Sequence, residues 1–215
     1  MKIGAIITGD IVDSTRLTLA EREAMLMGLE SLPEVLSPVE KIRMEIFRGD
    51  SFQIGIRDAE KSLKAALIIR SYLRSHRIES SGTLMDARLA LGIGTLDYES
   101  DTLSTSDGDA YRRSGRLLDS MDKSRLEIST PWNGVNDELK LSTAFADDII
   151  SGWTQSQSRV VMLSLLGGAQ PHYKIASELG VSRQTVDKSL RLSKEELINA
   201  YLTRFEELII KNTKE

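Results

Sequence analysis

The segment Ile46-Phe47-Arg48-Gly49-Asp50-Ser51-Phe52-Gln53-Ile54 places two short apolar, strand-like runs on either side of a Gly-Asp pair. Such a pair between two apolar runs favours a tight hairpin. A second pair, Gly9-Asp10, directly follows the apolar run 3–7. Two carboxylates at strand ends are what a site needs if it is to hold divalent cations against a phosphate. The alternative is that each aspartate only stabilises the turn in which it lies and binds no metal.

Length and charge limit the classes of protein to consider. The chain has 215 residues, which fits one large domain or a medium domain with a small one. Apolar residues make up 40% of it, as in an ordinary globular protein. The net charge of −4 means that the whole protein is not an electrostatic nucleic-acid binder. Any such role requires a local basic patch.

Other classes are excluded by what the sequence lacks. There is no cysteine, so the sequence has no disulfide framework and no thiolate metal site. The absence of cysteine and of a signal peptide points to the cytoplasm. With His76 and His172 as the two histidines, a histidine-rich metal site and most serine triads are excluded. No apolar run approaches the roughly 20 residues of a membrane helix, so no membrane partner is expected.

The periodicity of apolar residues around the hairpin predicts the elements of the N-terminal part. Strands are expected at 2–8, 39–47, 51–57, 86–94 and 124–129, and helices at 18–32, 59–77 and 109–121. This order predicts an α+β sandwich with helices on one face of a mostly antiparallel sheet. The ferredoxin-like split βαβ arrangement is its simplest form. The acidic segment 95–108 is expected to be a solvated loop.

Single residues predict where some of these elements begin and end. Thr18 and Glu21 have the spacing of a capping box, and Pro33 is expected to end the first helix. Asp58 is expected to cap the second helix. Glycines at 92 and 94 suggest that another segment passes close to the backbone of that strand.

From residue 142 onward the pattern is helical without strands, so we predict two domains, 1–141 and 142–215. Small and apolar residues then fall where a helix-turn-helix requires them. They are Ile175, Ala176 and Leu179 in the first helix, and Val186 and Leu190 in the second. Gly180 would open the turn and Ser182 would cap the second helix. Two ordinary packed helices are the alternative.

This C-terminal segment also supplies the local basic patch. Its charged residues from 171 to 194 are Lys174, Arg183, Lys188, Arg191 and Lys194 against Glu178 and Asp187. The sequence predicts DNA binding, with Ser182, Arg183, Gln184 and Lys188 on the exposed face of the second helix. Arg183 and Gln184 would reach base edges, and Lys174 and Arg191 would contact phosphates.

Several motifs together resemble known families. GDIVDS (9–14), GDSFQ (49–53) and DGDAY (107–111), ahead of the helix-turn-helix at about 153–195, resemble the SatD family of small bacterial proteins. Residues 2–130, which include LALGIGT (89–95) and LEIST (126–130), resemble the class III nucleotidyl cyclase fold. This second resemblance implies a site that binds a nucleotide or phosphate. It also implies a homodimer, because cyclases work across a two-fold interface.

The cyclase resemblance assigns residues to that site. It implies that Asp10 and Asp50, with the backbone of Ile11 nearby, hold catalytic Mg²⁺ or Mn²⁺ ions. Counting from the glycine at 108, Arg116 takes the place of the arginine that stabilises the transition state. Arg112 stands where cyclases carry an asparagine. With Arg113, these two arginines form a basic helix that would bind the nucleotide or another anion.

Two further departures remove contacts that orient the base or the ribose. Ile46 replaces the lysine that helps select adenine, and Thr105 replaces an acidic or polar partner. Because positioning supplies much of the rate enhancement in phosphoryl transfer, we expect a non-catalytic cyclase-like domain joined to a DNA-binding regulator. One alternative is an active metal-dependent nucleotidyltransferase or cyclase that uses Asp10, Asp50 and Arg116. A protein-interaction module is the other alternative.

Overall fold

The computed structural model describes residues 3–47, 49–97, 103, 106–168 and 170–214. Within these residues the strands form one five-stranded sheet of order β2-β3-β1-β4-β5. The strands are Ile3–Ile11 (β1), Arg43–Phe47 (β2), Ser51–Ile56 (β3), Ala87–Thr95 (β4) and Leu126–Ser129 (β5). Neighbouring strands are antiparallel except for β4 and β5, which are parallel.

The helices alternate with these strands and then follow them. They are Leu19–Leu36 (α1), Ser62–Arg74 (α2), Asp109–Ser120 (α3), Asn133–Ser151 (α4), Gln155–Gly167 (α5), His172–Leu179 (α6), Arg183–Leu192 (α7) and Glu195–Thr213 (α8). Two short 3₁₀ helices, Ser14–Arg16 (η1) and Ala59–Lys61 (η2), precede α1 and α2. The predicted element order through β5 is confirmed, and β1 to β4 have the split βαβ arrangement. The described helices include none that is both long enough and apolar enough to cross a membrane.

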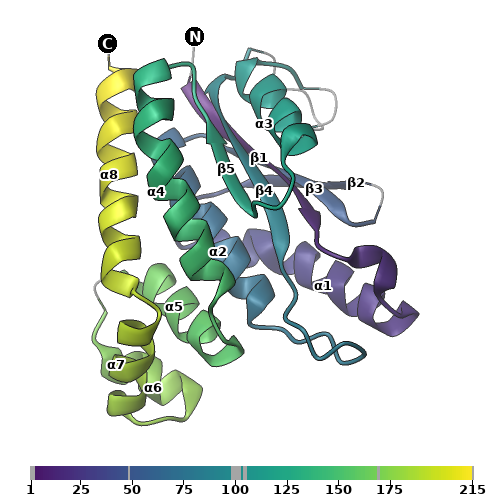
Figure 1. Cartoon of the computed structure of the whole chain (residues 1–215), viewed down its shortest axis with the longest axis vertical. Coiled ribbons are helices and arrows are strands. Elements are labelled where there is room, and N and C mark those ends of the chain that lie inside the picture. Colours follow the sequence, from purple (N-terminus) through teal and green to yellow (C-terminus); the bar gives the residue numbers. More distant parts are fainter. Residues whose placement is uncertain (1–2, 48, 98–102, 104–105, 169, 215) are drawn as a thin grey trace.

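The helices do not all cover one face of the sheet, so that prediction was wrong. Figure 1 shows α3 on the near side of the sheet, with α1 and α2 behind it. A parallel pair such as β4 and β5 needs a crossover connection, which α3 supplies. The helix lies close to the strand because Gly92 and Gly94 leave room for it. A Cβ atom at Gly92 would come within 2.4 Å of the Ala110 carbonyl oxygen. The predicted close approach at these glycines is confirmed.

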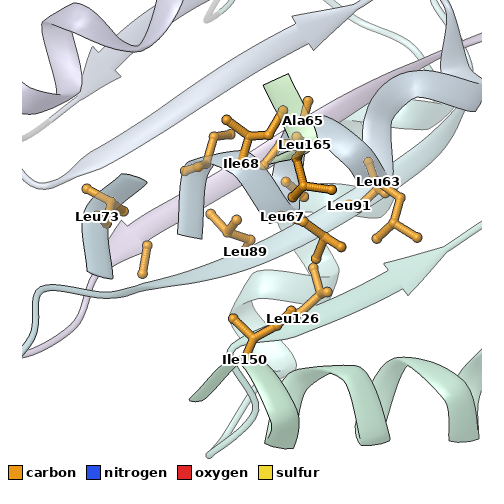
Figure 2. Packing of buried hydrophobic residues seen from close by; sticks show 14 of the residues in the cluster. Leu63, Ala65, Leu67, Ile68, Leu73, Leu89, Leu91, Leu126, Ile150 and Leu165 are labelled. Atoms are coloured by element: carbon orange, nitrogen blue, oxygen red, sulfur yellow. The ribbon is translucent and has the colours of Figure 1, made fainter. Parts of the chain in front are cut away.

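The opposite face of the sheet is packed against α1 and α2. Alternate residues of the central strands, such as Leu89 and Leu91, are fully buried there against Leu63 and Leu67 of α2. Figure 2 shows how this packing continues to Leu126, Ile150 and Leu165. One apolar cluster therefore extends from the sheet to α8. The predicted domain boundary between residues 141 and 142 falls inside α4, and the division into two domains stays a prediction.

Two of the expected helix ends differ from the structure. The capping box at Thr18 and Glu21 is present. However, α1 continues through Pro33 to Leu36. Burial of Leu32 and Leu36 in the core outweighs the backbone hydrogen bond that proline removes. Asp58 makes no capping hydrogen bond, because its carboxylate accepts from Nζ of Lys61 at 2.7 Å.

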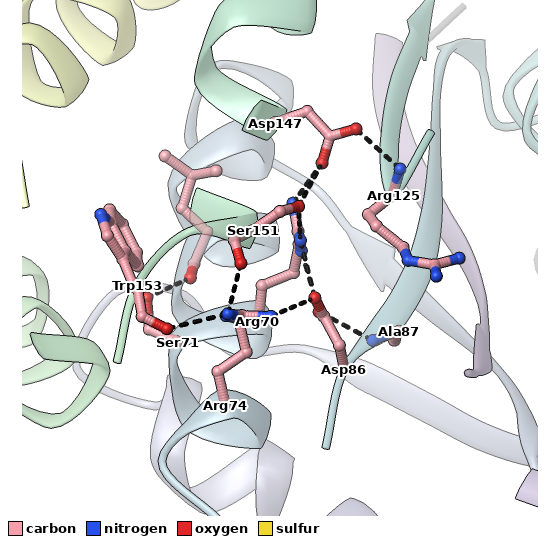
Figure 3. A network of polar contacts seen from close by, with 10 residues as sticks. Arg70, Ser71, Arg74, Asp86, Ala87, Arg125, Asp147, Ser151 and Trp153 are labelled. Atoms are coloured by element: carbon pink, nitrogen blue, oxygen red, sulfur yellow. Dashed lines mark hydrogen bonds and ion pairs between the residues drawn. The ribbon is translucent and has the colours of Figure 1, made fainter. Parts of the chain in front are cut away.

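A buried ionic network ties α2 to the start of β4 and to α4 (Figure 3). Arg70 is fully buried, and its Nε and Nη2 donate to the two carboxylate oxygens of Asp86 at 3.0 and 2.8 Å. Its Nη1 donates to Asp147 at 2.6 Å. Burial raises the pKa of Asp86, but attraction and hydrogen bonds from Arg70 and Arg74 outweigh it, so the pKa lies below its ordinary value. Each buried charge of the network is therefore compensated by the others, and removing one would leave its partners unpaired in the interior.

Candidate functional site

The two Gly-Asp motifs meet at one edge of the sheet. Asp10 lies near the end of β1, opposite Ser51 of β3. Asp50 lies in the turn between β2 and β3, where Gly49 has a φ of 81°, as the predicted hairpin requires. The backbone N–H of Ile11 donates to the carbonyl oxygen of Asp50 at 3.1 Å. The structure therefore brings Asp10, Ile11 and Asp50 together, as the sequence predicts.

The carboxylate of Asp10 is paired with an arginine that the sequence analysis missed. Arg88 lies directly opposite Asp10 in the β1–β4 register. Its Nε donates to Oδ1 of Asp10 at 3.0 Å, and its Nη2 contacts Oδ2. Hydrogen bonding to Asp10 raises the pKa of Arg88 above its ordinary value. Nη1 of Arg88 also donates to the carbonyl oxygen of Met121, at the end of α3, at 3.1 Å.

Asp50 has donors of its own. The hydroxyl of Ser14 in η1, a residue of the GDIVDS motif, donates to Asp50 at 2.5 Å. A weaker bond of 3.4 Å comes from Ser51. Ser14 is nearly buried, so the hydrogen bond fixes the hairpin tip against η1. The role of Ser14 was not predicted, although its place in the motif was the signal.

These contacts define what the edge can do chemically. Asp10 and Asp50 are hard oxygen ligands of the kind that Mg²⁺ and Mn²⁺ prefer. Within the described part of the chain, no cluster of three or more acidic, histidine or cysteine side chains could hold a metal ion. A cation at Asp10 would also have to displace Arg88. The metal site at Asp10 and Asp50 therefore stays a prediction.

Replacing Arg88 with alanine should raise the affinity for Mn²⁺ by roughly tenfold, because the Asp10 carboxylate loses a competing cation. Titration followed by electron paramagnetic resonance of Mn²⁺ measures this directly. Arg88→Lys keeps the positive charge and serves as the matched control. Adding Asp10→Ala to Arg88→Ala should abolish the gain. Equal affinity of the wild type and Arg88→Ala would contradict the role given to Arg88.

The three arginines of α3 lie elsewhere. Arg112 pairs with Asp107 at 2.8 Å, and Arg113 donates to Asp109 at 2.5 Å and to the carbonyl oxygen of Thr130 at 2.9 Å. They share a hollow of about 270 Å³ with an exposed Arg116, next to β5. The residues lining it are Asp109, Arg112, Arg113, Arg116, Leu117, Ser120 and Ser129. Neither Asp10 nor Asp50 lines this hollow, so the predicted arginine and carboxylate sets do not meet in it.

Of the two further departures from the cyclase pattern, Ile46 and Thr105, the structure describes the first. Ile46 lies on β2 opposite Phe52 of β3, as an ordinary member of the hairpin ladder. Thr105 lies outside the described residues, as do Glu99 and Asp101 of the acidic segment.

The C-terminal candidate site consists of α6, α7 and the turn between them. Gly180 follows α6 with a φ of 64°, and the hydroxyl of Ser182 accepts a hydrogen bond from the Thr185 N–H at the start of α7. The residues expected to pack these two helices are buried or partly buried. They are Ile175, Ala176 and Leu179 in α6, and Val186 and Leu190 in α7.

The residues predicted to contact DNA are all exposed. They are Lys174 on α6, Ser182 at the turn, and Arg183, Gln184, Lys188 and Arg191 on α7. Acidic side chains lie beside them, because Asp187, Glu195 and Glu196 line one hollow with Arg183 and Arg191. Asp187 is 3.7 Å from Nε of Arg183 and 2.5 Å from Nδ1 of His172. This second contact joins α7 to the start of α6, and His172 was not among the predicted site residues.

Solved structures resemble part of this chain. No protein-family model matches the chain, and no curated protein matches its sequence. The active GGEEF domain of a diguanylate cyclase from Vibrio cholerae is similar, with a TM-score of 0.45, 16% identity, and coverage of 61% of this chain and 85% of that one. A bacterial light-regulated adenylyl cyclase is similar with a TM-score of 0.45 and 17% identity, and the match covers 60% of this chain and 76% of that one. The guanylate cyclase domain of RhGC from Catenaria anguillulae, in complex with GTP, is similar with a TM-score of 0.37 and 15% identity. That match covers 52% of this chain and 81% of that one. These are likenesses of fold over part of the chain.

Proposed function

We propose that the chain binds DNA through α6 and α7, with α7 in the major groove. The observation that carries this proposal is the exposed run Ser182–Thr185 at the N-terminus of α7. Behind it, Val186 and Leu190 are buried, so the helix is held rigidly with its polar face outward. Recognition helices contact base edges with their N-terminal residues.

The side chains on this face fit the two kinds of contact that DNA offers. Arg183 can donate two hydrogen bonds to guanine, and Gln184 can pair with adenine. Lys174, Lys188 and Arg191 carry charges suited to phosphates. Because the net charge of the chain is −4, binding would depend on this patch rather than on the whole protein.

Salt dependence and two point variants test the proposal. Binding to DNA selected from a random duplex pool, measured by fluorescence polarisation, should weaken steeply with salt. Arg183→Ala should cost about 1–3 kcal/mol on the selected sequence and relax its specificity. Lys188→Ala should weaken binding to all DNA sequences alike. It should also reduce the slope of the logarithm of affinity against the logarithm of salt concentration by about 0.9.

The matched control is Arg16→Ala. Arg16, the last residue of η1, is exposed and pairs with Asp13, three residues earlier. The pair is comparable to that of Arg183 and Asp187 on α7. The Arg16→Ala variant should bind DNA as the wild type does. If the wild type shows no binding at low salt, the proposal fails and a protein-interaction module becomes the better reading of α6 and α7.

We also propose that the Asp10–Asp50 edge does not turn over nucleotides. The Arg88 guanidinium on Asp10 supports this, because it occupies the carboxylate that would hold the metal. Incubation with each nucleoside triphosphate and Mn²⁺ should give no product. If product forms with the wild type and disappears in Asp50→Ala, the chain is an enzyme and this proposal is wrong.

A further inference from the structure

A pocket of about 970 Å³ lies between α1 and the C-terminal end of α2, and no residue of the sites above lines it. The loop that follows α2 closes its third side. This volume is at the upper end of the roughly 300–1,000 Å³ typical of small-molecule sites. Its lining is mostly apolar and includes the adaptable side chains of Met27 and Met85.

Hydrogen bonds in the wall leave two acceptors. The hydroxyl of Ser31 donates to the carbonyl oxygen of Gly28 at 2.7 Å, so its contact of 2.8 Å with Tyr72 must be a bond donated by the tyrosine. Nδ1 of His76 lies 2.9 Å from the carbonyl oxygen of Tyr72 and therefore carries the proton of the neutral ring. The Tyr72 oxygen and His76 Nε2 are thus left as acceptors.

Of the three charged side chains that line the pocket, Glu21 and Arg77 are already engaged, and Glu79 is exposed at the rim. Glu21 accepts from the backbone N–H and the hydroxyl of Ser80 at 2.7 and 2.9 Å, besides its bonds in the capping box. These bonds, that of the Ser80 N–H first, lower the pKa of Glu21 to about 2. Arg77 donates to the carbonyl oxygen of Gly82 at 2.6 Å. Because the lining is mainly apolar and Glu79 lies at the exposed rim, recognition inside the pocket would rely mainly on shape and hydrogen-bond acceptors.

The wall of the pocket is bonded to the segment that leads into α5. Leu73 and His76 line the pocket, while Arg74 and Ser75 between them face the other way. Nη2 of Arg74 donates to the carbonyl oxygens of Ser151 and Trp153 at 2.6 and 2.8 Å (Figure 3).

Two further bonds extend this connection to α7. Nε2 of Gln155, the first residue of α5, donates to the carbonyl oxygen of Ser75 at 2.9 Å. Nε1 of Trp153 donates to the carbonyl oxygen of Ser193, which follows the last residue of α7, at 2.9 Å. A shift of the end of α2 would therefore be passed to both ends of the helical segment 155–192.

We propose that this α1–α2 pocket binds a small, uncharged, mainly apolar molecule with a hydrogen-bond donor, and that its occupancy alters α5 and α7. The consequence for DNA affinity rests on the function proposed above; the pocket and its link to α7 do not. N-phenyl-1-naphthylamine is a suitable probe, because it is uncharged, has two apolar ring systems and carries one N–H. Its fluorescence reports transfer from water to an apolar site.

Filling the pocket should abolish probe binding. A Cβ atom at Gly28 would meet only the ring and hydroxyl of Tyr72, at 3.8 Å, so the backbone has room for a side chain here and Gly28→Phe should fill part of the pocket. Gly134→Phe on α4, where a Cβ atom meets nothing within 4 Å, is the matched control. We expect saturable binding of one probe per chain, unchanged in Gly134→Phe and weakened at least about tenfold in Gly28→Phe.

Tyr72→Phe provides a second test that does not depend on filling the pocket. Loss of one acceptor should weaken probe binding by about three- to tenfold. The proposal is overturned if the wild type shows no saturable binding, or if Gly28→Phe binds the probe as the wild type does. Saturable binding that Gly28→Phe leaves intact would place the probe elsewhere, for example between two copies of the chain.

Hydrogen exchange measures the link to α7. Saturating probe should slow or speed amide exchange in α5 and α7 of the wild type and leave Gly28→Phe unchanged. DNA affinity should shift by at least about fivefold with the probe bound. Unchanged exchange and unchanged DNA affinity would overturn the link. A change in exchange in a chain that binds no DNA would support the pocket and its link while the proposed function fails.

Discussion

Replacing Asp86 with alanine should lower the free energy of unfolding by about 3–5 kcal/mol, because it leaves two buried guanidinium groups without their shared carboxylate. Arg70 is fully buried and Arg74 nearly so. The carbonyl oxygen of Asp86 also accepts a hydrogen bond of 3.0 Å from Val12, close to Asp10. Disorder at residue 86 would therefore reach the candidate metal edge. Urea denaturation followed by circular dichroism measures the loss.

Asp148→Ala is the control for this prediction. Asp148 is an exposed aspartate on α4, one residue after Asp147 of the network. Its replacement should change stability by less than about 0.5 kcal/mol. If Asp86→Ala costs no more than Asp148→Ala, the network does not support the fold in the way its geometry indicates.

The loss in Asp86→Ala should also depend on pH in a definite direction. Folding lowers the pKa of Asp86, so its ionised form contributes stability above the ordinary carboxyl pKa of about 4. That contribution disappears as the pH falls through the lower pKa of the folded state. The difference between wild type and variant should therefore be full at pH 7 and shrink on acidification below about pH 4.

Local signals were sufficient for the features that neighbouring residues determine. The capping box at Thr18, the left-handed turn at Gly180 and the cap at Ser182 each depend on a few consecutive residues. The meeting of Asp10 and Asp50 was also predictable, because both follow strand-like runs and the motif order resembled a known arrangement. Their partners were less accessible.

What the sequence could not supply is the register between distant segments. Arg88 reads as a polar residue in a strand, and only the β1–β4 alignment places it against Asp10. The local sequence suggests that Arg70 is an exposed basic residue on an amphipathic helix. In the structure it is buried against Asp147 of α4, which lies 77 residues later in the chain. Pro33 reads as a stop signal, and burial of Leu36 in the core overrides it. In each case the decisive energy comes from tertiary contact.

Trp153→Ala should be as damaging as the loss of Asp86. The indole is almost fully buried in the apolar cluster, and large-to-small changes of this kind cost about 3–5 kcal/mol. Trp153→Phe retains most of the packing but leaves the carbonyl oxygen of Ser193 without its donor, so it should cost about 1–2 kcal/mol. Urea denaturation of the two variants separates packing from the hydrogen bond.

The same measurement bears on how the helical part is joined to the sheet. Since one apolar cluster extends from the sheet to α8, the wild type should unfold in a single transition, with circular dichroism and tryptophan fluorescence changing together. Trp153 lies where Arg74 of α2 and Ser193 after α7 are both bonded, so Trp153→Ala should loosen α5–α7 first. Earlier hydrogen exchange in these helices than in β1 and β4 would be the expected sign. Two separated transitions in the wild type would instead mean that residues 142–215 fold as a unit of their own, and the effect of Trp153→Ala should then be confined to that unit.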